Sequence, residues 1–382
     1  MIGDRNMRVA MISAAPIAGD GPGWGAGLQV AELSAALAGR GHELHLFGPA
    51  ATRRSYYQQL GGLHYHVIGR DNRRTSWWND LVQASLYYLR ATERVAGPFD
   101  VVHGHHRALL PVLGAIKGSG HARTFLTLHS DVGICTATNG RRDESWHPLD
   151  AVTQVTTSSR AIKEKLVGRL ALAEERVHVV YPGVTLSKYS RWVDQGRVKE
   201  RYGFGPLDPT ILFVGEMSRA TGPDILLEAA FEAMHHSPHA KLVFVGDGPM
   251  LPYLKDRAAT LGVAPALRFL GFVDEERLID LYNACDLVCL PFRAGRAEQT
   301  VLEAWCAGKT AVVSRAAAPE FLDPTADGIV TRSEVAAVAE AISSSLSDEH
   351  ARQEMGRRVW HRASNEFSWE AIASRISQMY AE

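Results

Sequence analysis

The chain has 382 residues, of which 46% are hydrophobic, so it is long enough to form more than one hydrophobic core. Its 41 lysines and arginines balance 42 aspartates and glutamates, which excludes the basic field of proteins that bind nucleic acids through net charge. No apolar run reaches the roughly 18 residues of a membrane-spanning helix. The opening MIGDRNMRVAMISAAP does not resemble a signal peptide, and we expect a cytoplasmic location.

Short apolar runs alternate with longer segments of helical periodicity along the chain, which is typical of parallel sheets covered by helices. In the first half the expected strands are RVAMIS, HELHLF, DVVH, RTFLTLH, VTQVTTS and VHVVYPG. The second half repeats the alternation with TILFVGE, KLVFVGDG, RFLGFV, DLVCLPF and TAVVSR. The predicted fold class is α/β, with two Rossmann-like doubly wound domains that face each other across a ligand-binding cleft.

The polar stretch YPGVTLSKYSRWVDQGRVKERYGFGPLDP lies between the two halves and lacks strand periodicity, so we interpret it as a linker. It divides the chain into an N-terminal domain of residues 1–185 and a C-terminal domain of residues 186–366. Residues 367–382 have the pattern of one amphipathic helix.

A glycine-rich loop connects the first predicted strand to the first helix, with five glycines from Gly19 to Gly27. Glycine allows close approach of the backbone to a ligand, and the following helix presents unpaired N–H groups. The loop is therefore a candidate for binding phosphate or sugar, although a flexible connector has the same composition.

Histidines follow two neighbouring strands of the first half. His103, His105 and His106 lie at the end of one strand, and His129 ends the next. Zinc is one interpretation, but no carboxylate or cysteine follows at ligand spacing, and we predict no metal site. We interpret His129 as a polar contact in the binding site, with a structural role as the alternative.

A further polar loop precedes the helix of the second half that carries Glu303. The loop contains Arg293 and Arg296, and the helix begins near Glu298. A carboxylate in the first turns of such a helix can accept two hydrogen bonds from a diol such as ribose. A purely structural glutamate is the alternative.

Taken in order, these motifs resemble those of family 4 glycosyltransferases with the GT-B fold, over essentially the whole chain. The resemblance is carried by MRVAMIS with its glycine loop, AALAGRGHELHLF, DVVHGHH, TLH, VVYPGV, LFVGE, LVFVGDGP, LRFLGFV, LYNACDLVCLPF and LEAWCAGKTAVVS. It implies an N-terminal acceptor domain, a C-terminal nucleotide-sugar domain and a last helix that crosses back to the first domain. It also implies sugar transfer with retention of configuration, without a metal ion and without a cofactor other than the nucleotide-sugar co-substrate.

The resemblance also suggests roles for single residues. Glu303 matches the second glutamate of the family's paired motif, which holds the ribose, and His129 matches a histidine near the reacting sugar. Gly246 to Gly248 match a loop beside the base, and Gly25 to Gly27 match a loop over the donor phosphates. We predict His129 and Glu298 as catalytic; Gly25, Gly27, Glu216, Arg219, Gly246, Arg296, Thr300, Val301 and Glu303 as donor-binding; and Trp24, His103 and His105 as acceptor-binding.

Three positions depart from the family pattern. Glu216 and Thr221 stand where relatives carry an arginine and a lysine that clamp the donor diphosphate, and Gly295 replaces the first glutamate of the pair. Two like charges about 4 Å apart near a protein surface repel by about 4 kcal/mol, so Glu216 beside a diphosphate would weaken binding. Either Glu216 turns away or the donor is unusual.

Nearby arginines offer a replacement clamp. Arg219 lies between the two altered positions, and Arg293 and Arg296 flank Gly295. The forked guanidinium matches phosphate oxygens well, and Glu298 lies one turn from the missing glutamate. Solvated loop residues are the alternative interpretation of each arginine.

The segment of residues 70–90 combines Arg70, Arg73 and Arg74 with Trp77 and Trp78 at the start of an amphipathic helix. Such a helix can rest on a membrane surface. Packing of the same helix on the N-terminal sheet is the interpretation we favour.

The sequence thus predicts a retaining hexosyltransferase that uses a nucleotide-sugar donor and a small soluble acceptor. The altered positions keep two alternatives open, a fold relative without activity that binds a partner, and a transferase with a donor such as a sugar phosphate. The identities of sugar, base and acceptor and the oligomeric state are left open.

Overall fold

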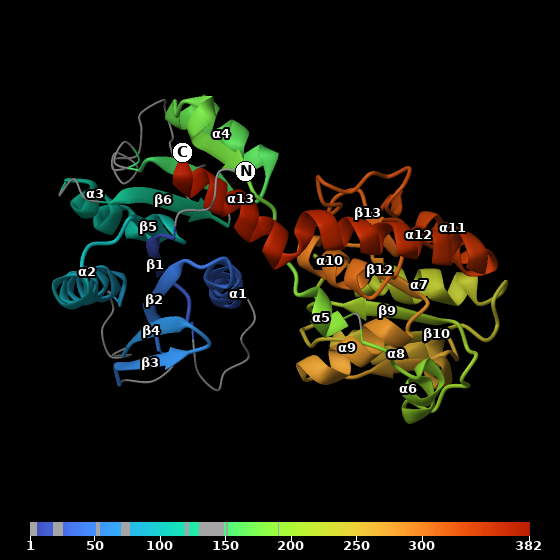
Figure 1. The fold of residues 1–382 in the computed structure, drawn as a ribbon. Helices are drawn as coiled ribbons and strands as arrows, with labels where there is room; N and C mark the ends of the chain where they lie inside the picture. Colours follow the sequence, from blue (N-terminus) through green and yellow to red (C-terminus); the bar gives the residue numbers. More distant parts are fainter. Residues whose placement is uncertain are drawn as a thin grey trace. The chain divides into compact units, whose positions relative to one another are not determined.

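The computed structural model describes residues 6–17, 26–50, 54–69, 77–118, 122–129, 149, 152–189 and 191–382 (Figure 1). The chain forms two compact units, the first of Met1–Gly183 with Trp369–Glu382 and the second of Val184–Ser368. The sequence had placed the domain boundaries after residue 185 and before residue 367. Each unit is described by itself below.

The first unit is built on an eight-stranded sheet in the order β3-β4-β2-β1-β5-β6-β7-β8, parallel except for the edge strand β3. Its strands are β1 (Arg8–Ile12), β2 (Glu43–Pro49), β3 (Tyr56–Leu60), β4 (Leu63–Ile68), β5 (Val101–Gly104), β6 (Arg123–Leu128), β7 (Gln154–Thr157) and β8 (Val177–Val179). Its helices are α1 (Ala26–Gly39), α2 (Trp77–Ala96), α3 (Leu110–Gly118), α4 (Arg160–Leu170) and α13 (Trp369–Ala381). The antiparallel hairpin of β3 and β4 is absent from the sequence-based strand assignment.

Both faces of this sheet are covered, because successive strand residues point to opposite sides. Val9 and Met11 of β1 belong to one apolar core together with residues of α1 and α13. Ala10 and Ile12 belong to a second core with residues of α3 and α4. The continuous apolar strands read from the sequence therefore reflect burial on two faces.

The apolar stripe of α2 is part of the second core. Leu89 is fully buried there, and Val82 and Leu86 pack against the same cluster. This stripe thus packs on the first unit, as expected for the packing interpretation of residues 70–90. Residues 70–76 and the side chains of Trp77 and Trp78 lie outside the described part. No described helix is both long enough and apolar enough to cross a membrane.

The C-terminal helix α13 packs beside α1 on the first unit (Figure 1). Its Ser377 hydroxyl lies 2.7 Å from Nε2 of the buried His42, and its Tyr380 hydroxyl lies 2.6 Å from Nδ1 of His103. A Cβ atom on Gly183 would come within 2.5 Å of the Trp369 indole ring, so glycine permits the close packing at the start of the helix.

The second unit contains a six-stranded parallel sheet in the order β11-β10-β9-β12-β13-β14, the strand order 3-2-1-4-5-6 of a doubly wound domain. Its strands are β9 (Thr210–Val214), β10 (Lys241–Val245), β11 (Leu267–Phe269), β12 (Leu287–Leu290), β13 (Ala311–Ser314) and β14 (Ile329–Thr331). Its helices are α5 (Leu186–Tyr189), α6 (Gln195–Arg201), α7 (Pro223–Ala233), α8 (Leu251–Thr260), α9 (Glu275–Ala284), α10 (Glu298–Cys306), α11 (Val335–Ser347) and α12 (Glu349–Arg362).

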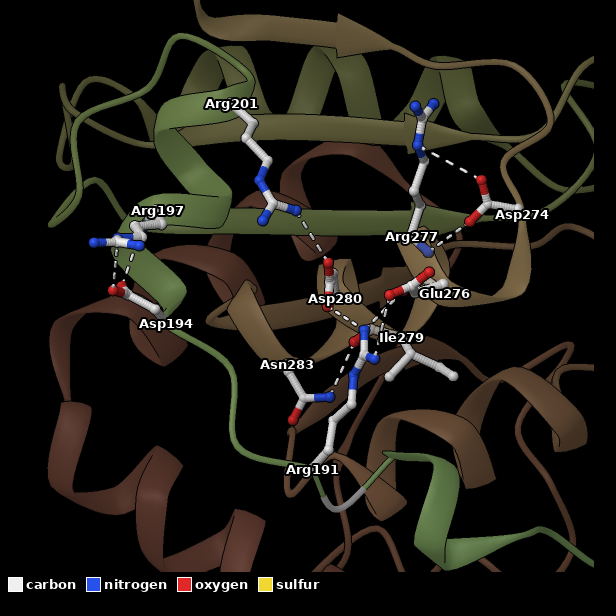
Figure 2. A network of polar contacts seen from close by, with 10 residues as sticks. All are labelled: Arg191, Asp194, Arg197, Arg201, Asp274, Glu276, Arg277, Ile279, Asp280 and Asn283. Carbon is white, nitrogen blue, oxygen red and sulfur yellow. Dashed lines mark hydrogen bonds and ion pairs between the residues drawn. The ribbon is translucent and has the colours of Figure 1, made fainter.

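The polar segment interpreted as a linker contains the boundary between the two units, after Gly183, but from Val184 onward it is a folded part of the second unit. It forms α5 and α6 and is fastened to α9 by charged side chains (Figure 2). Arg191 bonds Asp280 and the Glu276 carbonyl, and Arg201 reaches the second oxygen of Asp280 at 3.2 Å. A polar segment without strand periodicity thus became short helices held by ion pairs rather than by an apolar stripe.

Lys199 of α6 is the buried anchor of this segment. Its ammonium group donates to the Asp286 carboxylate and to the Asp208 carbonyl, both at 2.8 Å, and the residue is only 5% exposed. Asp286 also accepts the backbone N–H of Thr210, the first residue of β9, at 2.8 Å. The ammonium group therefore ties the segment to the start of the sheet.

We expect Lys199→Ala to lower the free energy of unfolding of the second unit by about 3 kcal/mol, because it leaves a half-buried carboxylate without its cation. Urea unfolding followed by circular dichroism measures this loss. Lys255→Ala, which removes an exposed lysine of α8, is the control and should change stability by less than about 0.5 kcal/mol. Equal stability of the two variants would contradict the anchoring role of Lys199.

Candidate functional site

In each unit the strand order reverses beside the first strand, and in doubly wound sheets ligands bind at this point, beyond the carboxyl ends of the strands. In the first unit the reversal lies between β1 and β5, whose following residues are the glycine-rich loop and His105. In the second unit it lies between β9 and β12. The loops that follow these two strands are residues 215–222 and 291–297.

The glycine-rich loop is described only in part, and the predicted contacts Trp24 and Gly25 lie outside the described residues. Gly27 stands in the first turn of α1. A Cβ atom there would lie 2.0 Å from the carbonyl oxygen of Pro16, so a larger residue would push the helix away from the end of β1. Glycine at this position sets the close approach of α1 to the predicted binding edge.

His103 is a structural residue of the sheet, which corrects its predicted acceptor role. It is fully buried, with Nδ1 2.6 Å from the Tyr380 hydroxyl and Nε2 2.7 Å from Oγ1 of Thr127. Burial lowers its pKa to about 3, so the ring is neutral at physiological pH. Both ring nitrogens are occupied, and none is left for an acceptor molecule.

His105 and His129 lie beyond His103 and keep unsatisfied ring nitrogens. The three imidazoles are stacked, with ring centroids 4.3 Å apart from His103 to His105 and 5.7 Å from His105 to His129. Among the described residues, no hydrogen-bond partner reaches either nitrogen of His105 or Nε2 of His129, and all three atoms are buried. Burial lowers both pKa values, that of His129 to about 4, so both rings are neutral at pH 7.

These two histidines line a small cavity of about 40 Å³ in the first unit. Thr156 and Ser158 of the neighbouring strand end, Tyr181 after β8 and apolar residues of α1 and α13 complete its wall. Buried polar atoms are normally hydrogen-bonded, and an unsatisfied imidazole nitrogen costs about 1–3 kcal/mol. The cavity is thus a polar site equipped to hold a hydroxyl group or water.

In the second unit, Thr221 holds the loop after β9 closed. Its hydroxyl donates to the Glu216 carbonyl and lies 3.0 Å from the Ser218 carbonyl, while the Ser218 N–H points back to it at 3.3 Å. A lysine in its place would extend toward a ligand, whereas this threonine bonds its own loop. The departure from the family pattern at Thr221 therefore has a local structural role.

The loop after β10 packs directly against the loop after β9. Met217 donates to the Asp247 carbonyl at 2.9 Å, and Gly246 donates to the Gly271 carbonyl at 2.8 Å. Gly246 has a φ of 120°, and a Cβ atom there would lie 2.0 Å from the Gly215 carbonyl oxygen. Glycine is required by this contact, which brings the predicted base loop and the predicted phosphate loop together.

Two of the three candidate arginines are paired with carboxylates. Arg293 forms a two-pronged ion pair with Asp224, both bonds 2.7 Å, and donates to the Arg219 carbonyl at 3.0 Å. Arg296 lies 2.8 Å through Nε from Oε1 of Glu298. Arg293 therefore joins the two loops at the strand-order reversal, and its charge is already neutralised.

Glu216 and Arg219 are the exposed charges of this loop. Within the described residues, neither side chain forms a hydrogen bond or an ion pair. Glu216 is exposed, which agrees with a carboxylate turned toward solvent, and Arg219 is the arginine whose guanidinium is free for an anion. Because Arg293 and Arg296 are paired with carboxylates, the positive and negative charges of the loops after β9 and β12 almost balance.

Glu303 is a buried carboxylate in the middle of α10. It is 8% exposed and accepts hydrogen bonds from Tyr282 at 2.8 Å and from Gln299 at 3.1 Å. Burial raises its pKa above 4.5, although the bonds from Gln299, Tyr282 and Tyr189 oppose that shift. Burying a carboxylate costs free energy, so a buried carboxylate is usually held by a hydrogen-bond network or needed for function.

The neighbouring predicted contacts on α10 have different environments. Val301 is fully buried, and its N–H donates to the Ala297 carbonyl at 2.9 Å, so the predicted donor contact of Val301 is not available. Thr300 is half-buried in the first turn. Within the described residues no side chain caps this helix end, so the N–H groups of its first turn are open to an anion.

One residue at this edge was missed in the sequence. Phe272, just after β11, is 82% exposed, and its neighbour Gly271 pairs with Gly246 of the predicted base loop. A large exposed aromatic ring beside a binding loop is suited to stacking on a planar ligand. The signal was present in GFV, where an aromatic residue directly follows the glycine that ends the strand.

Comparison with known proteins places this geometry in a family. The family model described as Glycosyltransferase Family 4 matches residues 24–188, and the model described as Glycosyl transferases group 1 matches residues 208–348. The D-inositol 3-phosphate glycosyltransferase of Corynebacterium kroppenstedtii is 31% identical over 61% of this chain, but the match spans only 54% of that protein. Spore coat protein SA of Bacillus subtilis is 26% identical over 91% of this chain and 92% of its own length.

A solved structure of Anabaena HepE in complex with UDP has the same fold. The match has a TM-score of 0.73 with 16% identity and covers 98% of this chain and 100% of that one. Likeness at this level of identity establishes the architecture, and the two family models cover most of both units. The chain therefore belongs to glycosyltransferase family 4 and has the GT-B fold of two Rossmann-like domains.

Proposed function

We propose that this protein transfers a sugar from a nucleotide-diphosphate donor to a hydroxyl group of a small soluble acceptor, with retention of configuration. The observation that carries the proposal is Glu303, a carboxylate held inside the second unit by Tyr282 and Gln299. A side chain as buried as that of Glu303 is normally apolar. A ligand with two neighbouring hydroxyl groups, in contrast, needs a carboxylate there to accept its hydrogen bonds. The family to which the chain belongs is one of glycosyltransferases.

A nucleotide is the donor we favour. HepE, which shares the fold, was solved with UDP. In this chain the base would stack on Phe272 beside Gly246, the ribose would bond Glu303, and the phosphates would meet Arg219 and the open amino end of α10. Together these groups offer one binding element for each part of a nucleoside diphosphate.

Arg219 is the residue we assign to the donor phosphates. Arg293 and Arg296 already form ion pairs with carboxylates of the protein, so their positive charges are neutralised. Arg219 is the one unpaired guanidinium of these two loops as far as the described residues show, and with the helix end it gives a weaker anion site than the family's arginine and lysine pair. We therefore expect modest donor affinity rather than loss of binding.

The acceptor or the transferred sugar would be held at the cavity of the first unit. His129 and His105 offer neutral ring nitrogens there, which suit hydroxyl groups better than phosphates. The curated relative named for D-inositol 3-phosphate supports a small polyol as the acceptor class. Reaction within the cytoplasm is in keeping with such soluble substrates.

Catalysis would rest on positioning of the two substrates and on stabilisation of the leaving phosphate. No strong general base is required in this scheme, because His129 contributes hydrogen bonding and Glu298 is held by Arg296. The scheme uses no metal ion, since the cationic partners of the phosphate are Arg219 and the helix amino end.

A second candidate function follows from the charge balance of the second unit. Glu216 is exposed and has no ion-pair partner among the described residues, and two of three nearby arginines are paired with carboxylates. Such a loop suits a donor with less charge than a diphosphate, for instance a sugar phosphate, or a binding protein without activity. Ligand binding separates these possibilities.

The decisive experiment is a thermal-shift screen of the full chain against UDP, GDP, dTDP, ADP and simple sugar phosphates, followed by a product assay with inositol phosphates. A ligand at about 100 times its dissociation constant stabilises the folded state by about 2.7 kcal/mol. A shift with one nucleoside diphosphate supports the proposal and names the base. A shift with sugar phosphates alone supports the second candidate, and no shift at all contradicts both donor assignments.

Arg219→Ala should weaken binding of the nucleoside diphosphate by about tenfold or more, since a hydrogen bond to a charged group contributes about 1.5–3 kcal/mol. Isothermal titration calorimetry with the nucleotide found in the screen measures the change. Arg197→Ala removes an arginine of α6 whose side chain is 81% exposed, and it should bind as the wild type does. Equal affinity of all three proteins would remove Arg219 from the site.

Glu303→Gln should reduce donor affinity about tenfold or more by loss of a charged acceptor while leaving the fold intact. A carboxyl group with a raised folded pKa binds more protons in the folded state, so its cost to stability grows as the pH rises above 4.5. The melting temperature of the variant relative to wild type should therefore be higher at pH 8 than at pH 5.

Glu340→Gln, at an exposed position of α11, is the control for both measurements and should alter neither. Donor affinity unchanged by Glu303→Gln would show that the buried carboxylate serves only the hydrogen-bond network with Tyr282.

A further inference from the structure

We propose that Glu43, His45 and His64 form a binding site for a divalent transition-metal ion, with Zn²⁺ as the ion of choice. One ligand atom from each of these side chains lies within 4.8 Å of the other two. The site belongs to strands β2 and β4 of the first unit. It is separate from the carboxyl-edge groups assigned to donor and acceptor.

The strand register brings the three side chains to one face. His45 of β2 is paired with His64 of the neighbouring parallel strand β4. Glu43 precedes His45 by two residues, so it points to the same side of the sheet. The two imidazole rings lie parallel with their centroids 4.4 Å apart. The pairing is thus fixed by the backbone and does not depend on a loop.

The Nδ1 atoms of His45 and His64 each have a hydrogen-bond partner. Nδ1 of His45 lies 3.0 Å from Nε2 of His66, and Nδ1 of His64 lies 2.7 Å from the Tyr57 hydroxyl. The bond from His66 leaves Nε2 of His45 to face Glu43 of the cluster. In metal sites, such partners orient the ring and fix which nitrogen carries the proton. A stack of histidines formed only for packing has no need of this arrangement.

Glu43 provides a carboxylate with one oxygen directed at the cluster. Oε1 lies 3.0 Å from Nε2 of His45, and Oε2 lies 3.0 Å from the guanidinium of Arg8. Arg8 therefore holds the carboxylate in place but also lowers the attraction of the site for a cation. Burial opposes ionisation of Glu43, yet the bonds from His45 and Arg8 lower its pKa, so the carboxylate is charged at pH 7.

The ligand set identifies the class of ion. Two imidazoles and one carboxylate suit Zn²⁺, Co²⁺ or Ni²⁺, whereas Mg²⁺ and Ca²⁺ prefer oxygen ligands alone. Water would complete a tetrahedral shell.

The position in the sheet indicates a structural rather than a catalytic role. Glu43 is the first residue of β2, so the cluster lies toward the amino ends of the strands, away from the carboxyl edge. The five residues of β3 are all exposed, and the β3–β4 hairpin closes this edge of the sheet. A metal bridge from β2 to β4 would fasten the hairpin to the rest of the unit.

The test is a calorimetric titration of the full, untagged, metal-free chain with ZnCl₂, together with the absorption spectrum of the Co²⁺-loaded protein. We expect one tight Zn²⁺ equivalent and the strong visible bands of tetrahedral Co²⁺. Thermal unfolding should shift upward with Zn²⁺, because the ion binds the folded state. Absence of a tight equivalent in the wild type overturns the proposal.

Variants locate the ion. His64→Ala and Glu43→Gln should each weaken Zn²⁺ binding by more than about 100-fold, and Tyr57→Phe by about tenfold. Glu43 has a side chain that is 42% exposed, so its variant tests the site even if His64→Ala does not fold. His236→Ala removes an exposed histidine of the second unit and should bind Zn²⁺ as the wild type does. Tight binding that survives Glu43→Gln and His64→Ala but is lost in His236→Ala would place the ion elsewhere and refute the assignment.

Discussion

Burial of both faces of each parallel sheet is the constraint on which the rest of this structure depends. In β1, alternate residues enter two different apolar cores, so no polar group can be kept in the body of the sheet without a partner. His103 shows the consequence, since its ring is held by Tyr380 and Thr127. The polar groups of the candidate site therefore lie at the strand ends, where His105, His129 and the loop after β9 are found.

The periodicity of the sequence predicted the parallel strands because continuous burial requires continuous apolar runs. It failed for the hairpin of Tyr56–Leu60 and Leu63–Ile68, because all five residues of β3 are exposed and do not alternate between apolar and polar. The pair Gly61 and Gly62 between them is a hairpin signal that was available. It also failed for α5 and α6, which are held by the ion pairs of Arg191 and Lys199, and such pairs leave no periodic trace.

The candidate site was predictable in position but less so in detail. Strand order and motif placement locate Glu303, Gly246 and the loop of Glu216 at the carboxyl edge. Sequence cannot reveal that Arg293 is neutralised by Asp224, because that ion pair joins residues 69 positions apart. It also cannot distinguish His103 from His105, which share a strand end and differ only in whether a partner reaches the ring.

The altered positions of the second unit form a connected change rather than separate substitutions. Gly295 has a φ of 107°, a conformation that a glutamate side chain would strain, so the first glutamate of the family pair cannot be restored by one substitution. The N–H groups of Arg293 and Ala294 in that loop donate to the Ala220 carbonyl, and Thr221 closes the neighbouring loop after β9. Here the loop backbones, the Thr221 hydroxyl and the ion pair of Arg293 with Asp224 support one another, so the altered positions belong to one consistent local structure.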